Sequence, residues 1–467
     1  MFASVCSVPC SRKGIPLRIT SISSFALAVI ALGGVCCGAV EEPIVGKPDS
    51  AVVAAAQPLT LDQCIAIALA NHPSIEGARR EVAGTRAGIR ASKSAALPQL
   101  AIASAYTQNN GQPIGGFLFS PPEGLAAAVS AKQLIYDSGR TPAAIRNAKF
   151  TLAATNAQFS NVEQNVVLGV RQSYYVLLAS KQLVITQTQA RDLSELHLKE
   201  ARARHSEGIA PKADVTKAEV EVSDAGLGLI HAENGVSLAY AALNNAIGFP
   251  PTTQLKLAGQ LQAPQQQPSL DDSLAMAYRN RPELLSIEAQ IRSEQEVVKV
   301  VAAETKPAVY LAGGNVWPRT TAGNGTTGGS NWTIGVVASQ TIWDGGGTKA
   351  RVEQARDAVG KMQADLANEK LQVGLEVQQA YLNVLEADKR VVAAAKLVEQ
   401  ADENHRIAQG RYTEGVGPMI DVVDAETQLT AARTSYVQAQ LDALVSRANL
   451  EKATGQAVPV KGVSNER

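Results

Sequence analysis

The feature that most constrains the fold is an internal repeat of about 200 residues. The segment Leu61–Pro73 (LDQCIAIALANHP) matches Leu270–Pro282 (LDDSLAMAYRNRP) at an offset of 209 positions. Gln133–Arg140 (QLIYDSGR) matches Gln340–Gly347 (QTIWDGGG) at an offset of 207, and later motifs keep that offset. Motifs that recur at one spacing are the sequence signature of a repeated structural unit. The sequence therefore predicts two copies of one unit rather than two unrelated domains.

The repeat divides the chain into five predicted segments. They are a signal peptide (1–39), a first repeat (40–248), a Pro/Gln-rich linker (249–269), a second repeat (270–455) and a C-terminal tail (456–467). Each repeat is expected to contain two short helices, two β-strands and a long helical hairpin, in that order.

The first segment has the organisation of an export signal. Basic residues precede the apolar run Phe25–Val35, and small residues up to Ala39 suit cleavage. A lipoprotein signal is the alternative, because Cys36 and Cys37 follow the run, although Gly-Val-Cys fits a lipid-attachment site poorly. Cleavage leaves Cys64 as the one cysteine, so we expect no internal disulfide and a packed Cys64 side chain. The remaining net charge of −3 gives no indication of nucleic-acid binding.

Each repeat ends in two long helices joined by a turn. The segment from about Thr141 to Arg204 has no proline after Pro142, and its counterpart from about Thr348 to Tyr412 has none. Some 65 residues at about 1.5 Å each give a helix of roughly 100 Å. Apolar residues of the second segment recur at coiled-coil spacing (Val352, Ala355, Val359, Met362, Leu366, Val373, Val377, Ala380, Val384, Val391 and Val398). A soluble rod or stalk stays the alternative at this point.

Each repeat also predicts two β-strands. The four candidates are Gln99–Thr107, Leu125–Tyr136, Ala308–Trp317 and Asn331–Trp343. Their lengths of about 9 to 13 residues suit tilted strands that cross a membrane. We expect Gly111–Pro122 and Pro318–Ser330 to be long solvated loops.

These four strands cannot form a membrane barrel alone. An open sheet edge in lipid leaves backbone amides unpaired, so other copies of the chain must complete the barrel. The smallest barrels have about eight strands, which makes two copies the minimum, whereas three copies give twelve strands. Two soluble hairpins that cap a helical bundle are the alternative.

The turn between the long helices is repeated, and its second copy carries an additional acidic residue. Glu207–Val222 (EGIAPKADVTKAEVEV) matches Glu414–Leu429 (EGVGPMIDVVDAETQL). We expect Pro418 at the first helical position. Asp421 and Asp424 are three residues apart and share one helix face. The helix dipole favours a carboxylate in the first turn, which explains Asp421 but not Asp424, whose counterpart is a lysine.

No constellation of residues indicates catalysis, a cofactor or a metal. Gly345–Gly347 lack the Gly-Lys-Ser/Thr ending of a phosphate-binding loop, so we interpret them as a strand-to-helix bend. The five histidines show no ligand spacing and are expected on the surface (His72, His197, His205, His231 and His405). We therefore expect a protein that is not an enzyme.

The order of the motifs resembles that of the TolC-like outer-membrane efflux proteins. The resemblance covers about Pro58 to Gly455 and rests on three repeated motifs: the Leu-Asp to Asn-x-Pro opening, the Tyr-Asp-Ser-Gly and Trp-Asp-Gly-Gly strand exits, and the Glu-Gly-x-x-Pro-x-x-Asp-Val turns. It implies a mainly α protein with a membrane β-barrel. In such a homotrimer, long coiled-coil helices form an α-helical barrel that continues into a twelve-stranded β-barrel, with four strands from each protomer.

The resemblance also implies a function. The protein would be an exit duct in the cell outer membrane, in contact with outer-membrane lipid and spanning into the periplasm of a Gram-negative-type envelope. It would conduct passively for an inner-membrane pump and a periplasmic adaptor (membrane fusion) protein, in tripartite efflux or type I secretion. The pump does most of the cargo selection, so no cargo follows. A periplasmic coiled-coil adaptor is the rival reading, and an exported enzyme is the second rival.

By the same resemblance, the two turns are periplasmic tips that close and open the duct. Asp421 and Asp424 correspond to the gate, where a trimer would stack two acidic rings. Tyr412 and Asp214 correspond to a latch between neighbouring tips. A basic residue of that latch in the best-known member falls on Gly417 here, so the latch lacks it. Lys212 and Lys217 are the candidate replacements, and the adaptor-docking positions are Arg204, Gly208, Arg411 and Gly415.

Overall fold

The structure is a computed structural model that describes residues 58–108, 123–259, 261, 269–322 and 325–456. Met1–Ser50 and Ala51–Arg467 are separate units, and every described residue belongs to the second. The predicted signal peptide, the predicted loop Gly111–Pro122 and residues 457–467 of the predicted tail lie outside the described residues.

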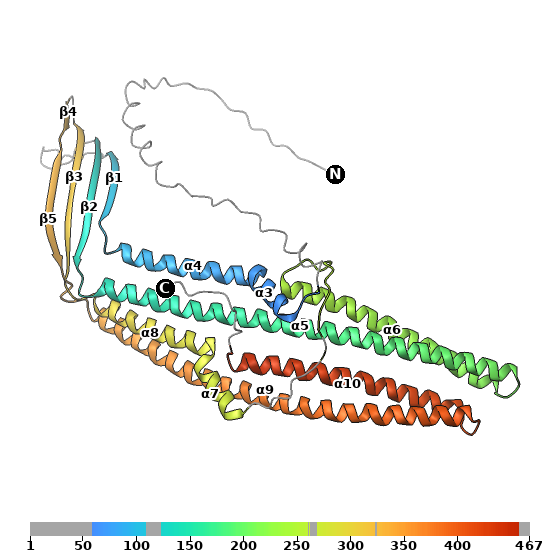
Figure 1. Ribbon diagram of the computed structural model, residues 1–467. Helices are drawn as coiled ribbons and strands as arrows, with labels where there is room; N and C mark the ends of the chain where they lie inside the picture. Colours follow the sequence, from blue (N-terminus) through green and yellow to red (C-terminus); the bar gives the residue numbers. More distant parts are fainter. Residues whose placement is uncertain (1–57, 109–122, 260, 262–268, 323–324, 457–467) are drawn as a thin grey trace, which may run out of the picture. The chain divides into compact units, whose positions relative to one another are not determined.

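The elements follow nearly the same order in both halves of the chain (Figure 1). The first half contains α3 (Leu61–Asn71), α4 (Pro73–Ser94), β1 (Gln99–Gln108), β2 (Glu123–Tyr136), α5 (Arg140–Ser206) and α6 (Lys212–Ile247). The second half contains α7 (Leu270–Asn280), α8 (Pro282–Ala302), β3 (Ala308–Ala322), β4 (Gly325–Gly328), β5 (Asn331–Ser339), α9 (Gly347–Thr413) and α10 (Met419–Ala453). The long helices α5 and α9 have 67 residues each and lie within a few residues of the predicted ranges.

The short helices of each half meet at the repeated Asn-x-Pro motif. Pro73 opens α4, because proline disfavours helix at the preceding residue and fits the first helical positions. The glycine that follows each hairpin packs against this corner. Gly248 has a φ of 89°, and a Cβ there would lie 3.2 Å from His72 Cα. Gly455 has a φ of 65°, and its Cβ would lie 2.8 Å from the Asn280 carbonyl carbon, so both positions require glycine.

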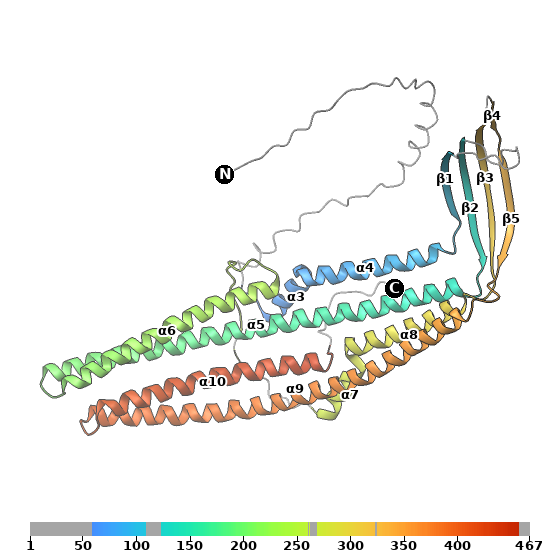
Figure 2. The same ribbon diagram turned by 180° about the vertical axis from the view of Figure 1, so that it is seen from behind.

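The long helices pair within each half and contact each other across the halves. α5 packs along α6 and α9 along α10, while α10 also contacts α5 (Figure 2). The predicted apolar stripe of α9 is buried at five of its eleven residues (Ala355, Val373, Val377, Ala380 and Val384), and the other six are half-buried. Cys64 is fully buried against residues of α5 and α6, as predicted.

Charged residues join α8 to α5 beside the core. Glu296 of α8 is 5% exposed and accepts hydrogen bonds from Arg146 of α5 and from Lys299. The Arg146 Nη2–Glu296 Oε2 distance is 2.8 Å, and the Lys299 Nζ–Glu296 Oε1 distance is 2.6 Å. Burial opposes ionisation of this carboxyl, but its bonds to Arg146 and Lys299 outweigh burial and lower the pKa of Glu296.

The strands form one antiparallel sheet in which β1 and β5 lie at opposite edges (Figure 1). β1 pairs with β2, β2 with β3 and β3 with β5, so the central pairing joins the two halves. Large apolar side chains point into solvent from the edge strands (Leu100 and Ile102 on β1; Trp332, Ile334 and Val336 on β5). A soluble sheet would bury such residues, because a contiguous exposed apolar patch marks a surface for protein or lipid.

The prediction of a long loop over Pro318–Ser330 is wrong for most of that segment. β3 continues through Pro318 to Ala322, and β4 pairs with it as Arg319↔Gly328 to Ala322↔Gly325. Pro318 lies where the partner of β3 changes from β5 to β4. Because proline has no backbone N–H to donate to a neighbouring strand, it is tolerated best at such an interruption of the strand pairing. β5 also ends at Ser339, before the predicted end at Trp343.

Within the described residues, no helix combines the length and the apolar character needed to cross a membrane.

Candidate functional site

The two hairpin turns have the same backbone geometry, and we call them the first tip (Glu207–Pro211) and the second tip (Glu414–Pro418). Each is a Schellman motif, in which a left-handed residue after the helix allows two backbone hydrogen bonds to its last carbonyls. In the first tip, Gly208 has a φ of 75° and Ile209 N donates to Arg204 O. In the second tip, Gly415 has a φ of 72° and Val416 N donates to Arg411 O.

In each Schellman motif, the side chain of the residue after the glycine is exposed to solvent. Ile209 is 72% exposed and Val416 is 69% exposed. A Schellman motif usually packs this side chain against the helix, but here the facing helix residues are arginines. Each tip therefore presents an apolar side chain beside an arginine, Arg204 or Arg411, on its end surface.

The helix that leaves the second tip begins one residue later than predicted. Pro211 and Pro418 are the N-cap residues of α6 and α10 rather than first helical residues. Their φ values of −72° and −78° match the fixed φ of proline. Asp214 and Asp421 lie in the first helical turns, where the helix dipole favours carboxylates.

The two predicted gate residues, Asp421 and Asp424, differ in their environment. Asp421 Oδ2 lies 3.8 Å from Arg411 Nη1, so an ion pair ties it to the end of α9. Asp424 is exposed and forms no ion pair within the described residues. Its charge faces Glu221 of α6, where burial, Asp224 and Asp424 together raise the pKa of the Glu221 carboxyl. The acidic residues near the second tip thus include Glu221 of α6 as well as Asp421 and Asp424 of α10. The sequence pattern did not indicate the contribution of α6.

The predicted latch residue Tyr412 contacts the predicted docking residue Arg204. Tyr412 is buried, and the Arg204 guanidinium carbon lies 4.5 Å from its ring centroid. Arg204 Nη2 also donates to Thr413 O at 3.2 Å. Burial raises the pKa of Tyr412, while the charge of Arg204 lowers it and the charges of Asp214 and Glu200 raise it. Arg204 therefore joins the two hairpins and is less available to a partner than Arg411.

The candidate replacements for the missing latch residue point to solvent. Lys212 and Lys217 are exposed, and in the described part of the chain neither forms an ion pair with Asp214. A Cβ at Gly417 would lie 3.1 Å from Arg411 Cβ, so the second tip has little space for a larger residue at this position.

The prediction that all five histidines lie on the surface is wrong for two of them. His197 of α5 is 2% exposed and His405 of α9 is 8% exposed. Their ring centroids lie 6.2 Å apart, close to the buried Glu426 of α10. His405 lies on the buried face of α9 with Ala401 and Ala408, so its helical spacing is the sequence signal from which its burial could have been predicted.

The glycine-rich motifs after the strands form bends, as predicted. Gly345 and Gly346 have φ values of 67° and 86°, and Asp344 Oδ2 accepts a hydrogen bond from Thr348 N. Asp137 Oδ2 accepts the corresponding bond from Thr141 N. The repeated aspartate thus satisfies the first free amides of each long helix.

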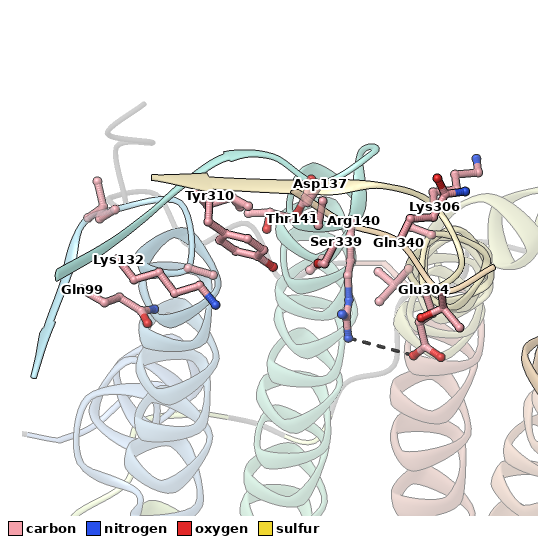
Figure 3. A pocket seen from close by; sticks show the side chains of 18 residues that line it. Gln99, Lys132, Asp137, Arg140, Thr141, Glu304, Lys306, Tyr310, Ser339 and Gln340 are labelled. Carbon is pink, nitrogen blue, oxygen red and sulfur yellow. Dashed lines mark hydrogen bonds and ion pairs between the residues drawn. The ribbon is translucent and has the colours of Figure 1, made fainter. Parts of the chain in front are cut away.

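A polar cavity lies where the strands meet the long helices (Figure 3). Two of its charged side chains, Lys132 and Arg140, have partners within the cavity wall. Lys132 Nζ lies 3.9 Å from the Tyr310 ring centroid, and Arg140 Nη2 lies 4.0 Å from Glu304 Oε1. The first contact joins β2 to β3, and the second joins the start of α5 to the segment that follows α8. We interpret the cavity as part of the junction between the strands and the helices.

Comparisons with known proteins agree with this architecture. The sequence model of the family described as outer membrane efflux protein matches residues 64–249 and 274–456. The chain is 24% identical over 405 residues to the outer membrane efflux protein BepC of Brucella suis, covering 85% of each chain. It is 23% identical to the outer membrane protein TolC of Vibrio cholerae, covering 79% of this chain and 84% of that protein. The solved outer membrane protein VceC of Vibrio cholerae superimposes with a TM-score of 0.71 at 18% identity, covering 85% of this chain and 96% of VceC.

Proposed function

Because the chain belongs to the outer membrane efflux protein family, we propose that it forms the homotrimeric exit duct of a tripartite efflux or type I secretion system. The protein is an outer-membrane efflux channel that extends into the periplasm. In the proposed assembly, an inner-membrane pump supplies the cargo and a periplasmic adaptor connects the pump to the duct. In this proposed role the duct conducts its cargo passively.

The open edges of the sheet support the proposal that three copies of the chain assemble. β1 and β5 each pair on one side only within the described residues, and both carry exposed apolar side chains. Unpaired backbone groups at such edges are too costly in lipid, so β1 of one copy must pair with β5 of the next. Three chains with four strands each give a barrel of about twelve strands, with β4 continuing the line of β5.

The helices supply a second surface for association. Apolar residues stay exposed along the outer faces of two long helices (Val220, Leu227, Ile230 and Leu238 on α6; Leu371, Leu375, Leu382 and Val392 on α9). Exposed apolar rows at helical spacing are typical of helices that pack against another subunit. We assign α6 and α9 to the contacts between neighbouring copies, which close the helical wall of the duct.

Asp421 and Asp424 form the proposed gate at the periplasmic end. Three copies bring six of these carboxylates to one constriction, where their charge attracts cations and excludes anions. The neighbouring Glu221 belongs to the same acidic group, because the charge of Asp424 is one of the causes that raise the pKa of its carboxyl. Tyr412 and Asp214 hold the tip closed, with Arg204 bridging the two hairpins of one copy.

The end surfaces of the tips are the proposed docking site for the adaptor. Arg411 is exposed, and Val416 and Ile209 project beside the arginines. This combination of an apolar anchor with a charged neighbour is typical of protein interfaces. Gly208 and Gly415 contribute the left-handed turn that points these side chains outward.

The test of the proposed function uses full-length protein extracted from the outer membrane in mild detergent. Native mass spectrometry should give three chains per particle, and the particles should form cation-selective channels in planar bilayers. In cells, the Arg411→Glu variant should lose export while three chains still assemble. A soluble periplasmic monomer without channel activity would contradict the proposal.

A further inference from the structure

Two histidines and one glutamate from three helices meet in the interior near the tips. His197 belongs to α5, His405 to α9 and Glu426 to α10, and their nitrogen and oxygen atoms lie within 4.8 Å of one another. His197 Nε2 is 3.4 Å from Glu426 Oε2. His197 and Glu426 are each 2% exposed and His405 is 8% exposed, so the cluster is more than nine-tenths buried.

Four polar atoms of this cluster lack hydrogen bonds. Among the described residues, no hydrogen-bond partner reaches His197 Nδ1, His197 Nε2, His405 Nε2 or Glu426 Oε2. Most buried polar groups in proteins are hydrogen-bonded, because leaving them unpaired away from water costs free energy. A ligand bound between the three side chains would satisfy these unpaired atoms, whereas apolar packing around them would not.

We propose that His197, His405 and Glu426 bind one divalent transition-metal ion of the zinc class. Two imidazoles and one carboxylate form a ligand set that zinc prefers, with a fourth position left for water. Ligands about 2.0–2.1 Å from a tetrahedral ion are roughly 3.3 Å from one another. The observed 3.4 Å between His197 Nε2 and Glu426 Oε2 matches that spacing, and His405 has to approach by less than 2 Å from its present position.

The surroundings favour a cation. Ser194 Oγ donates to Glu426 Oε1 at 3.4 Å and Glu200 Oε2 lies 3.8 Å from His197 Nδ1, so both ligands have an orienting neighbour. The charged groups that face the cluster are Glu200 on α5, Glu221 on α6, and Asp402 on α9 with Arg433 on α10. These are three carboxylates against one guanidinium, which leaves an excess of negative charge.

An ion at this position joins the two hairpins of one copy. α5 belongs to the first hairpin, whereas α9 and α10 belong to the second. The buried cluster that contains Ala201, Ala408 and Tyr412 lies between the ion site and the tips. A bound ion therefore holds together the two hairpins that carry the tips and stabilises their packing.

The three proposed ligands do not recur as a set at the corresponding positions of the other repeat. At the offset of 207, His405 corresponds to Leu198 and Glu426 to Glu219. Glu219 is instead paired with Arg202 on the surface, at 2.8 Å. The chain thus carries the complete set once among its described residues, between the hairpins rather than within each of them.

The experiment uses full-length protein with a purification tag that contains no histidine, extracted in detergent and stripped with a chelator. Zn²⁺ is titrated in competition with a chromogenic chelator, and Co²⁺ is added separately to record its visible absorption bands. The variants are Glu426→Gln and His405→Gln, and the control is His231→Ala, which removes an exposed histidine of α6.

We expect one Zn²⁺ per chain in the wild type and in the control, with a tetrahedral Co²⁺ spectrum. Each ligand variant should bind at least about 100-fold more weakly, and Zn²⁺ should raise the unfolding temperature of the wild type only where the ligands are intact. Less than one tightly bound Zn²⁺ per wild-type chain would overturn the proposal without reference to any variant. Unchanged affinity in Glu426→Gln or His405→Gln would also overturn it. Both readouts are independent of channel activity and of the number of chains.

Discussion

The guanidinium of Arg204, near the end of α5, stacks on the ring of Tyr412, near the end of α9, with 4.5 Å between the guanidinium carbon and the ring centroid. The same arginine donates a hydrogen bond to the carbonyl of Thr413. One side chain of the first hairpin thus makes two contacts with the end of the second. These contacts show that Arg204 bridges the tips, and its predicted role in docking stays a prediction.

The first prediction concerns this bridge. Arg204→Ala removes a cation–π contact and a hydrogen bond, each of about 0.5–1 kcal/mol, so the tips should open more often. We expect a larger mean conductance in planar bilayers. Arg202→Ala is the matched control, because Arg202 pairs with Glu219 inside the first hairpin and makes no contact across the tips among the described residues. Equal conductance of the two variants would show that Arg204 does not hold the tips.

The second prediction separates the two gate aspartates. Asp421 is partly neutralised by Arg411, whereas Asp424 has no ion pair among the described residues. Asp424→Asn should therefore reduce cation selectivity and block by divalent cations more than Asp421→Asn does. Reversal potentials in a salt gradient measure the difference. A larger effect from Asp421→Asn would mean that the ion pair breaks in the assembled gate.

The third prediction concerns acid stability. The pKa of Glu296 is lowered in the folded protein, so its ionised form stabilises the fold above the ordinary carboxyl pKa of 4.5. This contribution is lost as the pH falls through the lowered folded pKa. Glu296→Gln should cost about 1–3 kcal/mol near pH 7 and less at acid pH, because hydrogen bonds to a charged group are replaced by neutral ones. Thermal unfolding followed by circular dichroism between pH 3 and about 7 measures this, and an equal cost at both ends would contradict it.

The fourth prediction compares two glycines with positive φ. Gly415→Ala has open space around the new Cβ and should cost about 1–2 kcal/mol through backbone strain alone. Gly455→Ala also places its Cβ 2.8 Å from the Asn280 carbonyl carbon, so its cost should reach roughly 2–5 kcal/mol. Unfolding temperatures of the two variants measure the difference. Equal destabilisation would indicate that the α7–α8 corner moves freely.

Much of the fold could be predicted because the motifs that begin and end its helices and strands occur twice in the sequence. The Asn-x-Pro corners, the strand exits and the Gly-x-x-Pro tips each occur twice, and each marks a point where a helix must begin or end. The error at Pro318 arose because composition alone indicates a loop, whereas strand pairing decides which amide donors are needed.

The candidate site was less predictable because it depends on contacts between distant segments. His197 and His405 are 208 positions apart, and no local spacing brings them together. The proximity of Glu221 to Asp424 follows from the packing of α6 near α10, and the stacking of Arg204 on Tyr412 from the packing of one hairpin on the other. Such pairs appear only once the hairpins are placed side by side.

The most direct test of the shared barrel joins β1 of one copy to β5 of the next. In a Cys64→Ala background, Ile102→Cys on β1 and Ile334→Cys on β5 place one thiol on each edge strand, and a short membrane-permeable bis-maleimide links thiols in intact cells. We expect covalent products of one, two and three chains and none larger, with no ladder from either single-cysteine variant. Linkage confined to single chains, or a ladder that continues beyond three chains, would contradict a closed barrel built from three copies.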